Sequence, residues 1–131
     1  MYKKVFTLLL LLLPFQLLIA QKSLLKNFPE GYTPDEIGRR ISYRFVTEKH
    51  ALHAGKWIGY PETFYWNGSL KYAAAAKDKA LIKLLQARFE HLFTTEKALL
   101  PIKNHVDLNM FGSLPLELYW VTKDERYKEL G

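Results

Sequence analysis

Apolar residues along this chain recur mainly at the spacing of an α-helix, and short polar stretches separate them. Residues 34–47 are the first predicted helix, because Ile37, Ile41 and Phe45 recur every four positions while the arginines lie off that stripe. No segment alternates apolar and polar residues as a half-buried strand does. The pattern therefore predicts an all-α chain.

Four further segments have helical features. Residues 61–76 predict a second helix, although Gly68 inside it costs about 1 kcal/mol relative to alanine and points to close packing or a bound ligand. A third helix follows Asp78, a good N-cap residue, and its apolar face consists of Leu81, Leu84, Leu85, Phe89 and Leu92. A fourth is expected within residues 110–122, where a proline must lie in the first turn or kink the helix. A fifth begins after Asp124, which makes four or five helices in all.

Two segments resemble each other at a separation of 46 residues. The stretches "LKYAAAAKDKALIKLL" and "LELYWVTKDERYKELG" align on two Lys-Asp pairs, Lys77–Asp78 and Lys123–Asp124. In each copy a helix is followed by a tight turn, an aspartate cap and another helix. Such a two-helix repeat predicts a stacked array or a toroid, because a single hairpin cannot bury its apolar faces. The alternative is that two unrelated hairpins share an Asp-capped turn.

The first twenty residues have the order of a secretory signal peptide. A basic start, "MYKK", precedes the apolar run "VFTLLLLLL", and the small residue Ala20 ends the segment "PFQLLIA". A membrane anchor is the alternative, but Pro14 interrupts a run that is already short for the roughly 20 residues a span requires. Residues 1–20 are therefore interpreted as a cleaved signal peptide. An exported protein, periplasmic or secreted, with no stable membrane span after cleavage, is expected.

Composition excludes several classes of function. Loss of Lys3 and Lys4 with the signal peptide lowers the net charge from +6 to +4, a mild excess without the basic stripe of a nucleic-acid binder. The chain has no cysteine, so neither disulfides nor a lipid-attachment cysteine are expected. His50-x-x-His53 lacks a third ligand at diagnostic spacing, and no phosphate-binding glycine loop is present. No metal or cofactor is predicted.

Two stretches are candidates for chemistry. Asp107 is a lone carboxylate in the apolar segment "HVDLNMFGSLPLELYW", with His105 and Asn109 beside it. An aspartate at a helix start can simply cap the helix. It can also hold a sugar hydroxyl or assist proton transfer, and Asp107 is the candidate catalytic residue. In "YPETFYWNGSLKY", Tyr60 and Trp66 are candidates for stacking on a sugar, with His105 and Asn109 as further substrate-binding residues.

These same stretches resemble a known family. "YPETFYWNGSLKYA", "ARFEHLF" and "HVDLNMFGSLPLELYWVTKDERYKELG" are similar to the N-terminal part of the unsaturated glucuronyl and rhamnogalacturonyl hydrolases, glycoside hydrolase families 88 and 105. The likeness covers residues 37–131 and is strongest from His105 onward. It implies an (α/α)6 barrel, a toroid of helical hairpins, of which residues 21–131 would be the N-terminal part.

The resemblance also implies an activity. Such enzymes hydrate the vinyl-ether double bond of the unsaturated uronic acid that polysaccharide lyases leave on an oligosaccharide. Asp107 corresponds to the earlier, supporting aspartate of a pair, and no tryptophan-x-aspartate-aspartate-methionine segment for the second is present. Phe64 and Ser69 depart from the family pattern, which leaves the substrate specificity open. The resemblance implies no cofactor, and the partner it implies is the oligosaccharide.

The expected protein is thus a truncated, inactive part of a secreted glycosidase. A small helical carbohydrate-binding or interaction module is one alternative. Another enzyme with an (α/α)6 barrel, such as an epimerase-like or mannan-degrading relative, is a second.

Overall fold

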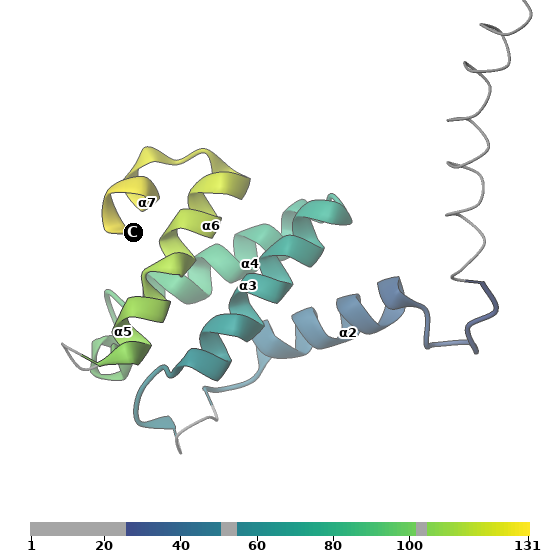
Figure 1. Ribbon diagram of the computed structural model, residues 1–131, viewed down its shortest axis with the longest axis horizontal. Coiled ribbons are helices and arrows are strands. Elements are labelled where there is room, and N and C mark those ends of the chain that lie inside the picture. Colours follow the sequence, from purple (N-terminus) through teal and green to yellow (C-terminus); the bar gives the residue numbers. More distant parts are fainter. Residues whose placement is uncertain (1–25, 51–54, 102–104) are drawn as a thin grey trace, which may run out of the picture. The chain divides into compact units, whose positions relative to one another are not determined.

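The computed structural model of the chain describes residues 26–50, 55–101 and 105–131 (Figure 1). The predicted signal peptide and His53 lie outside these ranges. All regular secondary structure in the described residues is helical: α2 Pro34–Thr47, α3 Tyr60–Ala75, α4 Lys79–His91, the 3-10 helix η2 Lys97–Leu99, α5 Val106–Phe111, α6 Ser113–Thr122 and α7 Glu125–Leu130. The all-α prediction is confirmed for this part of the chain.

The chain divides into two compact units, residues 1–33 and residues 34–131. In the first unit, the described residues 26–33 form a turn in which the Tyr32 amide donates to the Pro29 carbonyl at 3.0 Å. The second unit contains every helix named above. Among the described residues, no helix is both long enough and apolar enough to cross a membrane.

The fourth predicted helix is two helices in the structure. The expected range was 110–122, whereas α5 begins at Val106 and α6 follows it directly after Gly112. Pro115 explains the break, because its ring lacks an N–H and would clash with the carbonyl four residues earlier in a continuous helix. As the third residue of α6, Pro115 lies in the first turn, where no intrahelical partner is needed.

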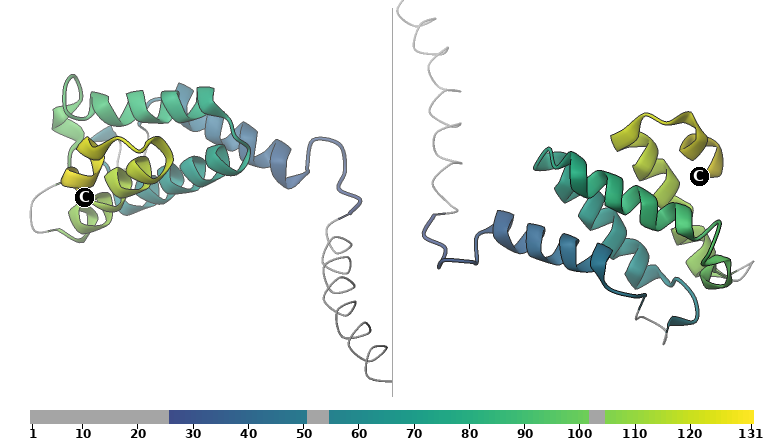
Figure 2. Two further views of the ribbon diagram at one scale, coloured as in Figure 1. Left: turned by 90° about the horizontal axis from the view of Figure 1, so that it is seen from above. Right: turned by 180° about the vertical axis from the view of Figure 1, so that it is seen from behind.

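Helix α3 is central to the second unit and contacts α2, α4, α5 and α6, while α7 packs on α6. Figures 1 and 2 show α3 and α6 running in the same direction and α4 returning beside them. Two side-chain contacts define their register. Asn67 Nδ2 donates to Ser113 Oγ at 3.0 Å, and Lys71 Nζ lies 3.4 Å from Glu117 Oε1. Both pairs join residues 46 apart, and a constant difference in residue number is the property of parallel helices in register.

The turns that follow α3 and α6 each contain a left-handed lysine followed by an aspartate N-cap. Lys77 and Lys123 both adopt the left-handed conformation, with φ of 56° and 60°. Asp78 then accepts a hydrogen bond from the Leu81 amide as N-cap of α4, and Asp124, the N-cap of α7, accepts one from the Arg126 amide. The separation predicted from the sequence therefore relates two hairpins that share their turn and contact each other at equivalent positions.

The core lies between α3, α4 and α6. Phe89 is at its centre, with ring centroids 6.1 Å from Trp66, 5.7 Å from Phe111 and 5.8 Å from Tyr127. All four side chains are buried, as are Leu70, Leu81, Leu85, Leu92, Leu114 and Leu118. The aspartate-capped hairpins thus bury their apolar faces against each other.

Gly38, rather than Gly68, marks a close approach between helices. A Cβ atom on Gly38 would lie 2.5 Å from the Tyr72 ring, so α2 approaches α3 more closely than a side chain permits. A Cβ atom on Gly68 would meet nothing within 4 Å. The close packing expected at Gly68 is therefore wrong, because this glycine lies on the exposed side of α3.

Candidate functional site

Asp107 lies where α3 and α5 begin, and it links the two helices. Its side chain is almost completely buried, with 4% of its surface exposed. One carboxylate oxygen accepts a hydrogen bond from the Tyr60 amide at 3.1 Å, and the other lies 3.3 Å from His105 Nδ1. Gly59, the N-cap residue of α3, has no side chain to satisfy that first turn. Asp107 therefore caps a helix that begins 47 residues earlier in the chain.

His105 is the N-cap residue of α5 and has two competing partners. Its Nδ1 atom accepts a hydrogen bond from the Asp107 amide at 3.2 Å and also faces the Asp107 carboxylate. A neutral imidazole with Nδ1 unprotonated accepts from the amide, whereas a protonated imidazole donates to the carboxylate. More than half of the His105 side chain is exposed, so a ligand can reach the imidazole. A carboxylate beside an imidazole is a combination that can take part in proton transfer.

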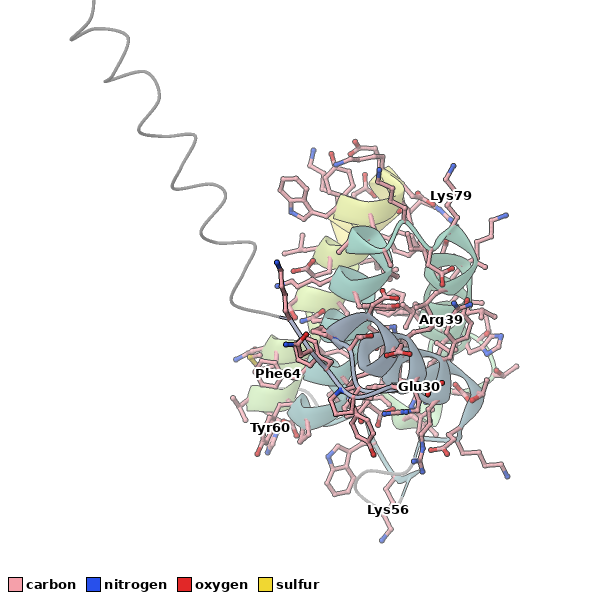
Figure 3. The ribbon with its side chains drawn as sticks, turned by 90° about the vertical axis from the view of Figure 1, so that its right-hand side faces the viewer. Glu30, Arg39, Lys56, Tyr60, Phe64 and Lys79 are labelled. Carbon is pink, nitrogen blue, oxygen red and sulfur yellow. The ribbon has the colours of Figure 1, made fainter. Side chains whose placement is uncertain are left out.

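Tyr60 is joined to Asp107 through its backbone amide, and its ring makes a separate aromatic contact. Its side chain is half exposed, and its ring lies edge-on to the exposed Phe64 ring with centroids 6.3 Å apart. Figure 3 shows both residues on the same side of the molecule. Asn109 is exposed on α5, and its side chain makes no hydrogen bond within the described residues. The structure thus brings Tyr60, His105 and Asp107 together.

Trp66 does not belong to this site, which corrects the sequence-based expectation. Its ring has no exposed surface and is edge-on to Phe45 and Phe89, and its Nε1 donates to the Leu85 carbonyl at 3.2 Å. The physical reason is the helical period. Six residues after Tyr60, a side chain lies about 120° away around the axis of α3 and faces a different neighbour. A sugar has no ring face to stack on at Trp66.

A buried cluster of charged side chains was not anticipated from the sequence. Glu62 is 3% exposed and forms a hydrogen bond with His50 Nδ1. Arg88 Nη2 lies 3.5 Å from Glu62 Oε1 and 3.2 Å from His50 Nδ1. Burial lowers the pKa of the Arg88 guanidinium, and the charge of Glu62 partly opposes this effect. The sequence contained one signal of this burial. Glu62 lies four residues before Trp66 and therefore on the same face of α3.

The two groups of residues differ in what they can do. The imidazole of the His105–Asp107 pair is more than half exposed, whereas the Glu62 and Arg88 side chains are 3% and 11% exposed. Within the described residues, no group of three or more potential ligands is arranged to hold a metal ion.

Comparisons of the chain with family models, with curated proteins and with solved structures give no significant match. Function must therefore be inferred from geometry and from the motif likeness.

Proposed function

We propose that the chain belongs to a carbohydrate-active helical domain of the unsaturated-uronide hydrolase type. The observation that carries this proposal is the His105–Asp107 pair, a carboxylate held against an exposed imidazole and bonded to the backbone amide of Tyr60, a residue whose side chain is half exposed. A carboxylate–imidazole pair can take part in proton transfer, and exposed aromatic side chains commonly line ligand sites. The likeness of the segment from His105 onward to the hydrolases supports the same assignment.

The helical packing supports a partial (α/α)6 barrel. In such a toroid the inner helices are parallel and each contacts its equivalent in the next hairpin, as α3 and α6 do through the pairs 46 residues apart. On α6, Leu116 and Trp120 are exposed at 42% and 68%. Apolar side chains gathered on one helix commonly mark a surface that packs on another element. We assign that surface to contact with a further hairpin of the toroid.

Asp107 is assigned a supporting role. Both of its oxygens are engaged, by the Tyr60 amide and by the His105 ring, so it orients the groups that face the sugar. Hydration of a vinyl ether adds a proton to one carbon and a hydroxyl group to the other, and a second acid is needed for the proton. The sequence has no second aspartate motif, so we expect the 131-residue chain to bind the uronide without turning it over.

Binding and turnover are tested together on the full chain. Amide shifts in ¹⁵N NMR spectra are followed during titration with an unsaturated glucuronyl disaccharide, and the loss of its double-bond absorbance is monitored in parallel. We expect saturable shifts at Tyr60, His105 and Asp107, no loss of absorbance, and weaker binding by Asp107→Asn. The matched control Asp124→Asn, an N-cap aspartate away from the site, should bind normally. Absence of saturable shifts around Asp107 overturns the proposal.

A carbohydrate-binding module without catalysis is the second candidate. It is favoured by the burial of Asp107, because a carboxylate that is 4% exposed has little access to a reacting atom. The titration distinguishes the two. A hydrolase-type site should bind the unsaturated disaccharide more tightly than its saturated counterpart, because it is shaped for the planar double bond. Equal affinity for both sugars supports the binding module instead.

A further inference from the structure

An apolar groove lies between α2 and α3, and it shares no residue with the His105–Asp107 pair. Its volume is about 250 Å³. Three large side chains along this α2–α3 groove are exposed, Ile41 at 41%, Phe64 at 58% and Tyr65 at 48%. Four of the other lining residues are small: Gly38, Ser42, Gly68 and Ser69. Large apolar side chains that remain exposed around small residues commonly mark a surface on which another element packs.

Helix α2 is a third copy of the second helix in each hairpin. The helices α2, α4 and α7 begin at Pro34, Lys79 and Glu125, which are 45 and 46 residues apart. Figures 1 and 2 show α2 and α4 both running opposite to α3. The two longer copies also share an apolar stripe with a four-residue spacing: Ile37, Ile41 and Phe45 in α2, and Leu81, Leu85 and Phe89 in α4.

The two stripes differ in what covers them. The three residues of the α4 stripe have no exposed surface, and α4 contacts both of the parallel helices, α3 and α6. Helix α2 packs on one parallel helix, α3, and Ile41 in the middle of its stripe remains 41% exposed. Within the part of the chain that the structure describes, the α2 stripe therefore lacks the second parallel helix that covers the stripe of α4.

The equivalent position beside α4 and α6 is held by α3, which shows what kind of element fits. The core side chains of α3 include Trp66, Leu70 and Ala73, at positions i, i+4 and i+7 of one helix face. A Cβ atom on Gly68 would meet nothing within 4 Å, so another helix backbone can approach α3 closely there. The groove thus has the place and the small residues that one additional helix requires.

The packing of α2 also limits what can enter. Because α2 packs on α3 in the way that α4 packs on α6, the position of a second hairpin helix is already taken. If the α6–α7 hairpin of another copy packed on α3 as α6 does within the chain, its α7 would lie where α2 lies. The open position accepts a helix that arrives without a hairpin partner.

We propose that the α2–α3 groove binds one amphipathic helix of another polypeptide, with apolar side chains at positions i, i+4 and i+7. This helix lies beside α3 as α3 lies beside α6, and its apolar stripe covers Ile41, Phe64 and Tyr65. Recognition of a helix by an apolar groove rests on burial of apolar surface, so the affinity changes little with salt. The assignment is independent of the function proposed for Asp107, because both the residues and the class of ligand differ.

The test is a ¹⁵N NMR titration of the full chain with a synthetic peptide. The probe has the sequence of residues 60–76, because α3 fills the equivalent position beside α4 and α6. We expect saturable shifts of the Ile41, Phe64, Tyr65 and Gly68 amides, in low and in high salt. The same peptide carrying Leu70→Asp should bind at least about tenfold more weakly, because a charge then replaces a buried leucine of the apolar stripe.

Substitutions in the chain separate the groove from the rest of α3. Gly68→Leu fills the groove with a side chain that meets nothing in the fold, and it should weaken peptide binding at least about tenfold. Ala75→Leu is the matched control, because Ala75 is exposed on the same helix and does not line the groove. If Gly68→Leu fails to fold, Ile41→Gln on the exposed side of α2 makes the same comparison.

Several results would overturn the proposal. Shifts that do not saturate, equal binding of the two peptides, and equal affinities of Gly68→Leu and Ala75→Leu each do so. Shifts confined to Leu116 and Trp120 also do so, because the peptide would then pack on the exposed side of α6. Sedimentation of the chain alone tests the remaining occupant. A dimer that forms without peptide and is abolished by Gly68→Leu assigns the groove to a second copy and overturns the partner assignment.

The outcome is separate from that of the sugar titration. Binding of the unsaturated disaccharide is read at Tyr60, His105 and Asp107, none of which lines the α2–α3 groove. Failure of the groove and failure of the proposed function are therefore distinguishable in the spectra of the same protein.

Discussion

Replacing Gly38 and Gly68 by alanine, one at a time, tests how closely α2 and α3 pack. Both glycines lie inside helices, so each substitution gains about 1 kcal/mol of helix propensity. They differ in what the new methyl group meets. On Gly68 it enters open space, whereas on Gly38 it lies 2.5 Å from the Tyr72 ring. The Tyr72 hydroxyl donates to Asp35 at 3.1 Å, which restrains that ring.

The expected free energies of unfolding follow from these contacts. Gly68→Ala should raise the free energy of unfolding by about 1 kcal/mol. Gly38→Ala gains the same amount but overpacks the α2–α3 contact, which costs about 1–3 kcal/mol, so the net change is a loss of about 0–2 kcal/mol. The two variants should therefore differ by about 1–3 kcal/mol, which corresponds to at least about 4 °C in Tm for a unit of this size.

Urea unfolding followed by far-UV circular dichroism measures both variants under the same conditions. Equal slopes with urea concentration are required, since a changed slope indicates a changed unfolded or native state. If Gly38→Ala is stabilised as much as Gly68→Ala, then α2 does not pack on Tyr72 as described. The reasoning also fails if Gly68→Ala is strongly destabilised, because that glycine would then face a neighbour.

Three further predictions concern the caps and turns. Asp107→Ala should lower the free energy of unfolding by about 0.5–2 kcal/mol, because the first turn of α3 loses its cap. Amide exchange should become faster in the first turn of α3 but not in that of α4. Unchanged exchange in α3 would falsify the role of Asp107 as the cap. Lys77→Gly and Lys123→Gly should each raise Tm, because both lysines adopt a positive φ that glycine tolerates better. The gain should be smaller at Lys123, because its ammonium lies 4.7 Å from the centroid of an aromatic ring and this contact would be lost. A loss of stability in both variants contradicts the turn geometry. Hydrogen bonding from the Leu81 amide lowers the pKa of Asp78 below its ordinary 3.8, so its stabilisation is present above pH 3.8 and is lost as the pH falls through the folded-state pKa. The difference between the urea midpoints of the wild type and Asp78→Asn should accordingly shrink as the pH is lowered. A difference that stays constant with pH contradicts the stabilising role of the ionised Asp78 carboxylate.

Local features of the sequence were sufficient to place most helices. The predicted range 34–47 coincides with α2, and Asp78 and Asp124 cap α4 and α7 as expected. These predictions succeeded because the helical period and the capping residues act over a few neighbouring positions. The boundary between α5 and α6 was missed because Pro115 can be accommodated either by a kink or by a new first turn, and the sequence does not choose between them.

The candidate site was predicted only in part, for a related reason. His105 and Asp107 are neighbours in sequence, so their proximity to each other follows from the chain itself. That Asp107 reaches the amide of Tyr60 depends on the parallel packing of α3 beside α5 and α6. The burial of Trp66 likewise depends on which face of α3 meets α4.

The sequence by itself determined where α2, α4 and α7 begin, how α4 and α7 are capped, and the 46-residue separation between two similar hairpins. Only the tertiary structure decided that these hairpins pack in parallel register, that Trp66 belongs to the core, and that Glu62 meets Arg88. Periodicity shows which residues share a helix face. Which neighbour that face contacts is settled by the summed packing of residues far apart in the chain.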